Sequence, residues 1–131
     1  MSIFVDTSAI YALLDADDAN HAAARSAFAG FREAALTTHA YVVVESVALV
    51  SRRLGREATT HFIDDLLPVI DVEMVDAGLH AIALASFREG HMTGVRFVDR
   101  TSFVYMRQRG IETAFAFDTD FASAGFRVTP G

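Results

Sequence analysis

The sequence predicts an α/β domain built on a mainly parallel sheet, and three observations support this prediction. Short apolar runs alternate with longer amphipathic stretches, which is the pattern of repeated β-α-β units. Hydrophobic residues make up 52% of the 131 residues, enough to bury a sheet under helices. No internal repeat, linker or low-complexity tract interrupts the pattern, so residues 1–131 are expected to form a single domain.

Five short apolar runs are the predicted strands. The first ends directly at Asp6, and the fourth ends directly at Asp118. Pro68 opens the third run, and proline is tolerated at the first residue of a strand. The predicted strands cover residues 2–5, 35–38, 68–72, 114–117 and 126–128.

Helices are expected in the longer stretches between these runs. Residues 39–54 are ambiguous, because Tyr41 and the three valines after it favour a strand by propensity. The length of this stretch and its end at Gly55 favour a buried helix, which is the interpretation adopted. The other predicted helices cover residues 8–14, 20–34, 57–66, 76–89 and 100–109, with a loop over residues 90–97.

Composition excludes several classes of protein. No apolar run approaches the roughly 18 residues of a membrane span, and the N-terminus lacks the pattern of a signal peptide. The absence of cysteine excludes disulfides and thiolate zinc sites. A cytoplasmic protein with no membrane association is therefore expected.

The net charge of −6 argues against binding to nucleic acid. Two features weaken this objection. A metal site built from carboxylates would account for part of the negative charge, and residues 88–109 contain five arginines against two acids. All eleven basic residues are arginine, the side chain that binds phosphate in a planar, bidentate manner.

Three acidic residues are expected at one edge of the sheet. Asp6 and Asp118 follow predicted strands, and Asp99 opens the helix that leads into the strand before Asp118. A crossover helix runs antiparallel to its strands, so its N-terminus lies at the edge where the strands end. Clustered carboxylates repel one another unless cations are bound, and hard oxygen ligands favour Mg²⁺ or Mn²⁺.

Glu45 is not placed at this edge by the strand pattern. It lies about six residues into the predicted helix after the second strand, on the order of 9 Å along the helix axis. Its neighbours are mostly valine and alanine. A glutamate in such company is rarely buried unless it is paired or bound to a metal, and a solvated helix face is the alternative.

Each candidate also has a purely structural interpretation. Asp6 and Asp99 can act as helix caps and Asp118 as a turn residue, while Asp120 is better explained as a cap than as a metal ligand. Three hydroxyl residues are either caps or groups that hold the carboxylates in place: Ser8, Thr101 and Thr119.

Taken in order, these motifs resemble those of PIN domains, and more narrowly those of VapC-type toxins from bacterial toxin–antitoxin pairs. The resemblance extends over essentially the whole chain. Its spacing is about forty residues from Asp6 to Glu45 and nineteen from Asp99 to Asp118. The motifs are Phe4-Val-Asp6-Thr-Ser8, Glu45 in a Val/Ala-rich helix, Phe97-Val-Asp99-Arg-Thr-Ser-Phe103 and Phe117-Asp118-Thr-Asp120-Phe121, followed by Gly125-Phe126.

The resemblance implies a three-layer α/β/α fold with a five-stranded parallel sheet in the order 3-2-1-4-5. It implies Mg²⁺- or Mn²⁺-dependent endonucleolytic cleavage of RNA by activated water. Asp6, Asp99 and Asp118 would be metal ligands, Glu45 a ligand or an orienter of water, and Asp120 a weaker candidate ligand. It further implies a homodimer and a cognate VapB-like antitoxin, held in an apolar groove between the first two helices.

Other classes of protein fit the sequence less well. Phosphatases of the haloacid dehalogenase type and response-regulator receivers need a lysine, and the chain has none. A PIN-fold nuclease that acts on DNA remains an alternative, as does a catalytically silent PIN-fold interaction module. Retention of all four acids disfavours the silent module.

Overall fold

The strands form one parallel sheet in a computed structural model that describes residues 1–90 and 94–131. Within these residues the sheet has five strands in the order β3-β2-β1-β4-β5, and every neighbouring pair is parallel. The order implied by the resemblance is confirmed. The strands are β1 (Ser2–Val5), β2 (Ala35–His39), β3 (Asp71–Glu73), β4 (Thr113–Phe115) and β5 (Arg127–Thr129).

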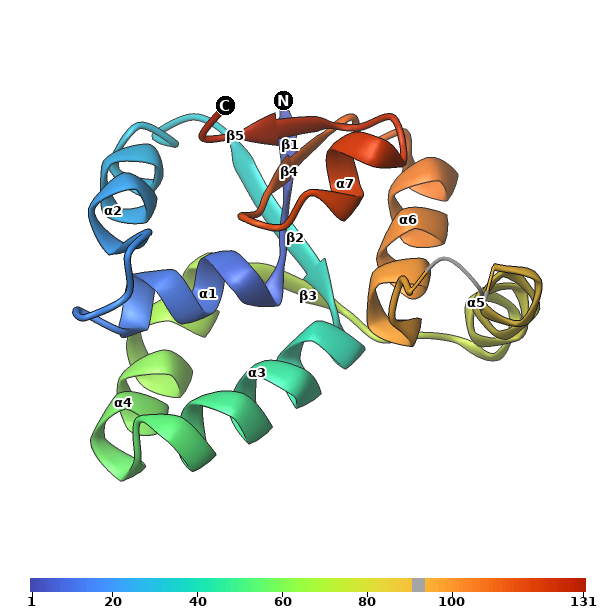
Figure 1. Ribbon diagram of the computed structural model, residues 1–131. Helices are drawn as coiled ribbons and strands as arrows, with labels where there is room; N and C mark the ends of the chain where they lie inside the picture. The colour runs from blue at the N-terminus through green and yellow to red at the C-terminus, as the bar shows by residue number, and fades with distance from the viewer. Residues whose placement is uncertain (91–93) are drawn as a thin grey trace.

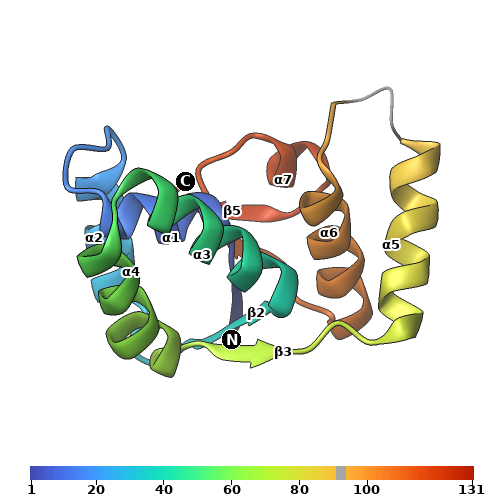
Figure 2. The same cartoon turned by 90° about the horizontal axis from the view of Figure 1, so that it is seen from below.

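Helices cover both sides of this sheet, as the predicted fold class requires. Four of them, α1 to α4, lie on one side and α5 with α6 on the other (Figures 1 and 2). No helix within the described residues is long and apolar enough to cross a membrane. The helices are α1 (Thr7–Leu14), α2 (His21–Ala29), α3 (Ala40–Arg53), α4 (Arg56–His61), α5 (Ala77–Glu89), α6 (Phe97–Arg109) and α7 (Asp120–Ser123).

The central strand β1 is buried on both faces. Ile3, Phe4 and Val5 are each 1% exposed or less, which is typical of a strand in a sheet covered on both sides. The ring of Phe4 contacts the rings of Tyr105 and Phe121. This packing fixes the position of the residue that follows the strand, Asp6.

The ambiguous segment is a helix, as predicted, but only one face of it is buried, since Val44 is 67% exposed. Val42 is fully buried on α3, so burial outweighs the strand propensity of the valines. Gly55, at φ 87°, separates α3 from α4, as expected for a glycine after a helix end. The predicted helix over residues 57–66 begins as α4 and continues as a π-helix, η1 (Phe62–Leu66).

The second helix is shorter than predicted. It ends at Ala29 rather than at residue 34, and Gly30 follows it. Glycine is unfavourable inside a helix, and the turn after it brings the ring of Phe31 against Phe115 at an edge-to-face distance of 5.1 Å. Packing of the partly buried Phe31 against the core therefore outweighs continuation of the helix.

The third and fifth strands begin later than predicted. Residues Leu67–Val69 form a 3₁₀ turn, η2, with Pro68 near its start, where a fixed φ and a missing N–H are tolerated. The strand therefore begins at Asp71. The fifth strand is displaced by one residue. The loop predicted over residues 90–97 includes residues 91–93, which lie outside the described part of the chain.

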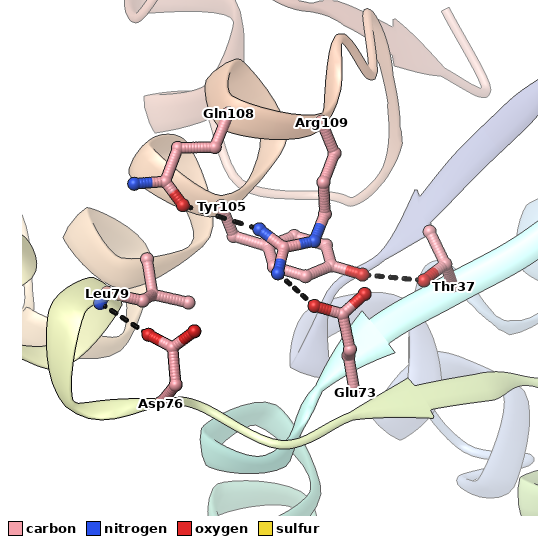
Figure 3. A network of polar contacts seen from close by, with 7 residues as sticks. All are labelled: Thr37, Glu73, Asp76, Leu79, Tyr105, Gln108 and Arg109. Carbon is pink, nitrogen blue, oxygen red and sulfur yellow. Dashed lines mark hydrogen bonds and ion pairs between the residues drawn. The ribbon is translucent and has the colours of Figure 1, made fainter.

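Helix α6 is anchored to the sheet by polar contacts at its C-terminal end (Figure 3). The Tyr105 hydroxyl lies 2.7 Å from the Thr37 hydroxyl on β2. Arg109 forms an ion pair with Glu73 on β3, and its guanidinium lies 4.2 Å from the centre of the Tyr105 ring. Nearer the start of the helix, Ser102 Oγ lies 2.9 Å from His39 Nε2. These contacts set the direction in which the N-terminus of α6 points.

Candidate active site

Asp6 stands where β1 ends and α1 begins. Its backbone N–H donates to the Phe115 carbonyl on β4 at 3.0 Å. Its carboxylate Oδ2 accepts hydrogen bonds from the backbone N–H of Ser8 at 3.1 Å and from the Ser8 hydroxyl at 2.6 Å. Asp6 therefore caps α1, as its structural interpretation predicted. This cap occupies only Oδ2.

The other two strand-edge acids reach the same place from different elements. Asp99 lies inside the first turn of α6, which begins at Phe97, so it is not the residue that opens the helix. Asp118 lies three residues after β4 rather than directly after it. The strand ends early because the Phe117 N–H leaves the ladder and donates to Ser8 Oγ at 3.0 Å.

The three aspartates form one cluster. Each offers a carboxylate oxygen, and these oxygens lie within 4.8 Å of one another. Asp6 and Asp99 are buried at 3% and 4% exposure, and Asp118 is half-buried. The prediction that Asp6, Asp99 and Asp118 share one edge of the sheet therefore agrees with the structure.

Glu45 faces the same cavity from α3, although it stands outside the 4.8 Å cluster. A cavity of about 570 Å³ is lined by all four acids. The negative charge of Glu45 contributes to raising the pKa of Asp6 and of Asp99. The Ser46 hydroxyl donates to the Thr7 hydroxyl at 3.4 Å, which ties this part of α3 to the start of α1.

Burial and mutual repulsion raise the pKa of two of the aspartates. Burial, as the largest cause, raises the pKa of Asp6 to about 6, against the opposing hydrogen bonds from Ser8. Burial followed by the charges of Asp6 and Asp118 raises the pKa of Asp99 to about 7. Carboxylates this difficult to ionise are typical of functional sites.

The cluster fits a hard divalent cation. Among the residues that the structure describes, Asp6 Oδ1 and Asp99 Oδ2 are buried without a hydrogen-bond partner, and such unpaired buried oxygens are costly unless something binds them. The three carboxylates also converge, with oxygens that lie within 4.8 Å of one another. The donor set is all oxygen, as Mg²⁺ and Mn²⁺ prefer.

The hydroxyl candidates differ in what they contact. Ser8 bonds the Asp6 carboxylate and accepts from Phe117, so it joins the β1–α1 junction to the loop that carries Asp118. Thr101 donates to the Phe97 carbonyl within α6 rather than to a carboxylate. Thr119 is exposed at the start of α7. Only Ser8 therefore has a contact that orients one of the acids.

Asp120 contacts the site through its backbone. Its N–H donates to Asp118 Oδ1 at 2.6 Å, and it lies in the first turn of α7. This contact orients the Asp118 carboxylate. The clustered carboxylate oxygens come from Asp6, Asp99 and Asp118, and the N-cap of α7 is Thr119. The Asp120 side chain is therefore not the cap that the sequence favoured.

The cavity also includes residues that the sequence did not single out. Tyr11 on α1, Arg52 and Arg53 on α3, and Arg96 before α6 all line it. A signal for Arg52 was present, because it lies seven residues after Glu45 and therefore on the same face of the helix. Of the arginines in residues 88–109, Arg96 reaches the cavity, whereas Arg109 pairs with Glu73.

Comparison with known proteins gives close and distant relatives. A curated relative, the 23S rRNA-specific endonuclease VapC20 of Mycobacterium tuberculosis (strain ATCC 25618 / H37Rv), is 40% identical over 125 residues, which cover 95% of each chain. The crystal structure of Mycobacterium tuberculosis VapC20, described as a sarcin–ricin loop cleaving toxin, is 39% identical, with a TM-score of 0.86 over 95% of each chain.

More distant structures share the fold. VapBC2 from Rickettsia felis, bound to a promoter DNA fragment, has a TM-score of 0.75 at 11% identity, covering 98% of this chain and 97% of that one. Residues 3–127 match the PIN domain family. The chain therefore belongs to the PIN domain family and is a VapC-type member of it.

Proposed function

We propose that the protein is a Mg²⁺- or Mn²⁺-dependent endoribonuclease and the toxin of a VapBC-type toxin–antitoxin pair. The observation that carries the proposal is the buried cluster of Asp6, Asp99 and Asp118, with two carboxylate oxygens that lack a hydrogen-bond partner among the described residues. The 40% identity to a 23S rRNA-specific endonuclease supports the choice of RNA as substrate.

In this proposal the four acids have two different roles. Asp6, Asp99 and Asp118 hold the divalent ion, which when bound neutralises charge on the phosphate and makes water more acidic. Glu45, half-buried on the α3 side of the cavity, accepts a hydrogen bond from the attacking water. Ser8 keeps the Asp6 carboxylate in one orientation through its 2.6 Å hydrogen bond.

The proposed substrate is 23S ribosomal RNA, at a loop of the sarcin–ricin type. This assignment follows the names of the relatives that are 40% and 39% identical to this chain. Single-stranded loops expose unstacked bases, which are what proteins read in RNA. Ribosomal RNA places the proposed activity in the cytoplasm.

Mapping of RNA ends tests the function directly. Expression of the wild-type chain is expected to arrest growth and to produce new 5′ ends at one site in 23S rRNA, whereas Asp6→Asn produces none. Asparagine still caps a helix, so the variant tests the charge rather than the fold. Cleavage of DNA alone would favour the PIN-fold DNA nuclease. A well-expressed, folded wild type that cuts neither RNA nor DNA would favour the silent interaction module.

We further propose that the VapB-like antitoxin occupies a second cavity beside the first two helices. This cavity of about 450 Å³ lies between α1, α2 and the end of α4 with η1, and solved neighbours with the same fold are VapBC assemblies. Its lining combines apolar residues with two histidines and an arginine, which suits an amphipathic partner segment. The lining residues are Leu13, Leu14, His21, Arg25, Phe28, Ala29, His61 and Leu66.

Ala29→Arg is expected to weaken antitoxin binding by at least tenfold. Ala29 is exposed and lines this cavity, so the new side chain places a charge beside Arg25 in an apolar groove. Ala23→Arg is the matched control, because Ala23 is exposed on another face of α2. Calorimetric titration with the antitoxin measures the difference. Equal affinity of the two variants would contradict the proposed groove.

We also propose a homodimer that uses the surface where α3 meets α5. The Tyr41 hydroxyl on α3 lies 2.5 Å from His80 Nδ1 on α5. One helical turn beyond these residues, Val44 is 67% and Leu84 46% exposed. An interface on this surface would bury these exposed apolar side chains, and the mass measured by sedimentation tests whether the protein is a dimer.

A further inference from the structure

The active-site cavity is larger than the acid cluster requires, and one wall of it is aromatic and basic. Its volume of about 570 Å³ lies within the range of sites that enclose a small ligand. Tyr11 on α1 and Arg52 and Arg53 on α3 form this wall. Both arginines are exposed, and α1 and α3 lie side by side in Figure 1.

Arg53 and Tyr11 form a defined pair. The guanidinium carbon of Arg53 lies 5.8 Å from the centre of the Tyr11 ring, within the range of a cation–π contact. A hydrogen bond to Asp15 raises the pKa of Tyr11, and Arg53 opposes that shift. The contact with Arg53 therefore positions one face of the Tyr11 ring.

The distance from this wall to the acids suits a neighbouring nucleotide of a bound RNA strand. Glu45 and Arg52 are seven residues apart on α3, which is two turns, or about 10 Å along the helix axis. An RNA strand with one phosphate at the acids therefore passes Arg52 and Arg53 at a neighbouring nucleotide. Since the protein carries a net charge of −6, these exposed arginines supply attraction for phosphate beside the acidic cluster.

We propose that Tyr11 and Arg53 form a subsite for an unpaired nucleotide next to the cleaved bond. Tyr11 stacks on the base, and Arg53, aided by Arg52, contacts the phosphate. Stacking on an aromatic side chain and contact between arginine and phosphate are the two means by which proteins hold single-stranded RNA. This inference rests on the proposed ribonuclease function and adds where the substrate binds.

The test compares four variants on one short RNA hairpin with the sarcin–ricin loop sequence. Tyr11→Ala is expected to raise KM by about 5- to 100-fold, the range typical of a lost base stack, with kcat changed less than twofold. Tyr11→Phe keeps the ring and is expected to keep KM. Arg53→Ala is expected to raise KM and to lower the slope of log KM against log salt by about 1. Arg127→Ala is the control, because Arg127 is exposed on β5 away from the cavity.

A binding measurement separates the subsite from the catalytic proposal. Binding of the same hairpin is measured by fluorescence anisotropy in Asp99→Asn variants. These variants are expected to leave the RNA intact, so the measurement does not depend on cleavage. Weaker binding on adding Tyr11→Ala, with Tyr11→Phe unchanged, supports the subsite even if the wild type fails to cut RNA. If the wild type cuts the hairpin but Tyr11→Ala leaves KM and binding unchanged, the subsite is overturned and the ribonuclease proposal stands.

Discussion

Asp99→Asn is expected to reduce RNA cleavage by more than 100-fold while leaving the protein folded. Groups that merely orient a metal ligand typically contribute 10- to 100-fold to activity or metal affinity, and Asp99 offers one of the three clustered carboxylates itself. Asparagine keeps the shape of the side chain but removes the charge that attracts the cation. Initial cleavage rates at saturating Mg²⁺ or Mn²⁺ measure the effect.

Asp71→Asn is a matched control for this variant. Asp71 is an exposed aspartate at the start of β3 and does not line the acidic cavity, so its activity should equal that of the wild type. A lower melting temperature for Asp99→Asn together with unchanged cleavage would contradict the assignment of Asp99 to the metal site.

Without metal, Asp99→Asn is expected to be more stable than the wild type at neutral pH. Folding raises the pKa of Asp6 from 3.8 to about 6 and that of Asp99 from 3.8 to about 7. The folded state therefore holds protons that the unfolded state releases. The associated stability is complete below about pH 4 and is lost as pH rises through 6 to 7. Asp99→Asn avoids the part of this loss that is due to Asp99. The free energy of unfolding of the variant is therefore expected to exceed that of the wild type by on the order of 2 to 4 kcal/mol at pH 8.

Urea unfolding in EDTA from pH 4 to pH 8 measures this difference. The two proteins are expected to have equal free energies of unfolding near pH 4 and to diverge as pH rises. Mg²⁺ at pH 8 should stabilise the wild type more than the variant, because an ion that binds only the folded state adds stability by mass action. The opposite trend would contradict this prediction. If the wild type gains stability relative to the variant between pH 4 and pH 8 without metal, burial does not disfavour the ionised aspartates.

Much of the fold was predictable because it depends on local pattern. The apolar runs of β1 and β2 are set by burial on both sides of a sheet, and Gly55 and Asp76 mark a helix end and a helix start through their own backbone and side-chain chemistry. The boundaries that were wrong depend on distant contacts. The chain leaves α2 after Ala29 because Phe31 packs on Phe115, a contact between residues far apart in the sequence.

The site divides in the same way. The amino-acid sequence alone predicts that Asp6, Asp99 and Asp118 lie near one edge of a parallel sheet, because a strand end and a crossover-helix start occupy that edge whatever the details of packing. It also predicts a preference for a hard divalent cation, because the candidate donors are all carboxylates.

The positions of the acids relative to their surroundings depend on tertiary packing. The 4.8 Å spread of the carboxylates, the position of Glu45 in the same cavity and the pairing of Arg53 with Tyr11 depend on how α1, α3 and α6 pack. That packing rests on contacts such as Ser46 with Thr7 and Ser8 with Phe117, the latter 109 residues apart in the chain. Sequence periodicity predicts which face of its own helix a residue occupies. It does not predict which residue of another element contacts that face, because this depends on the packing of the whole core.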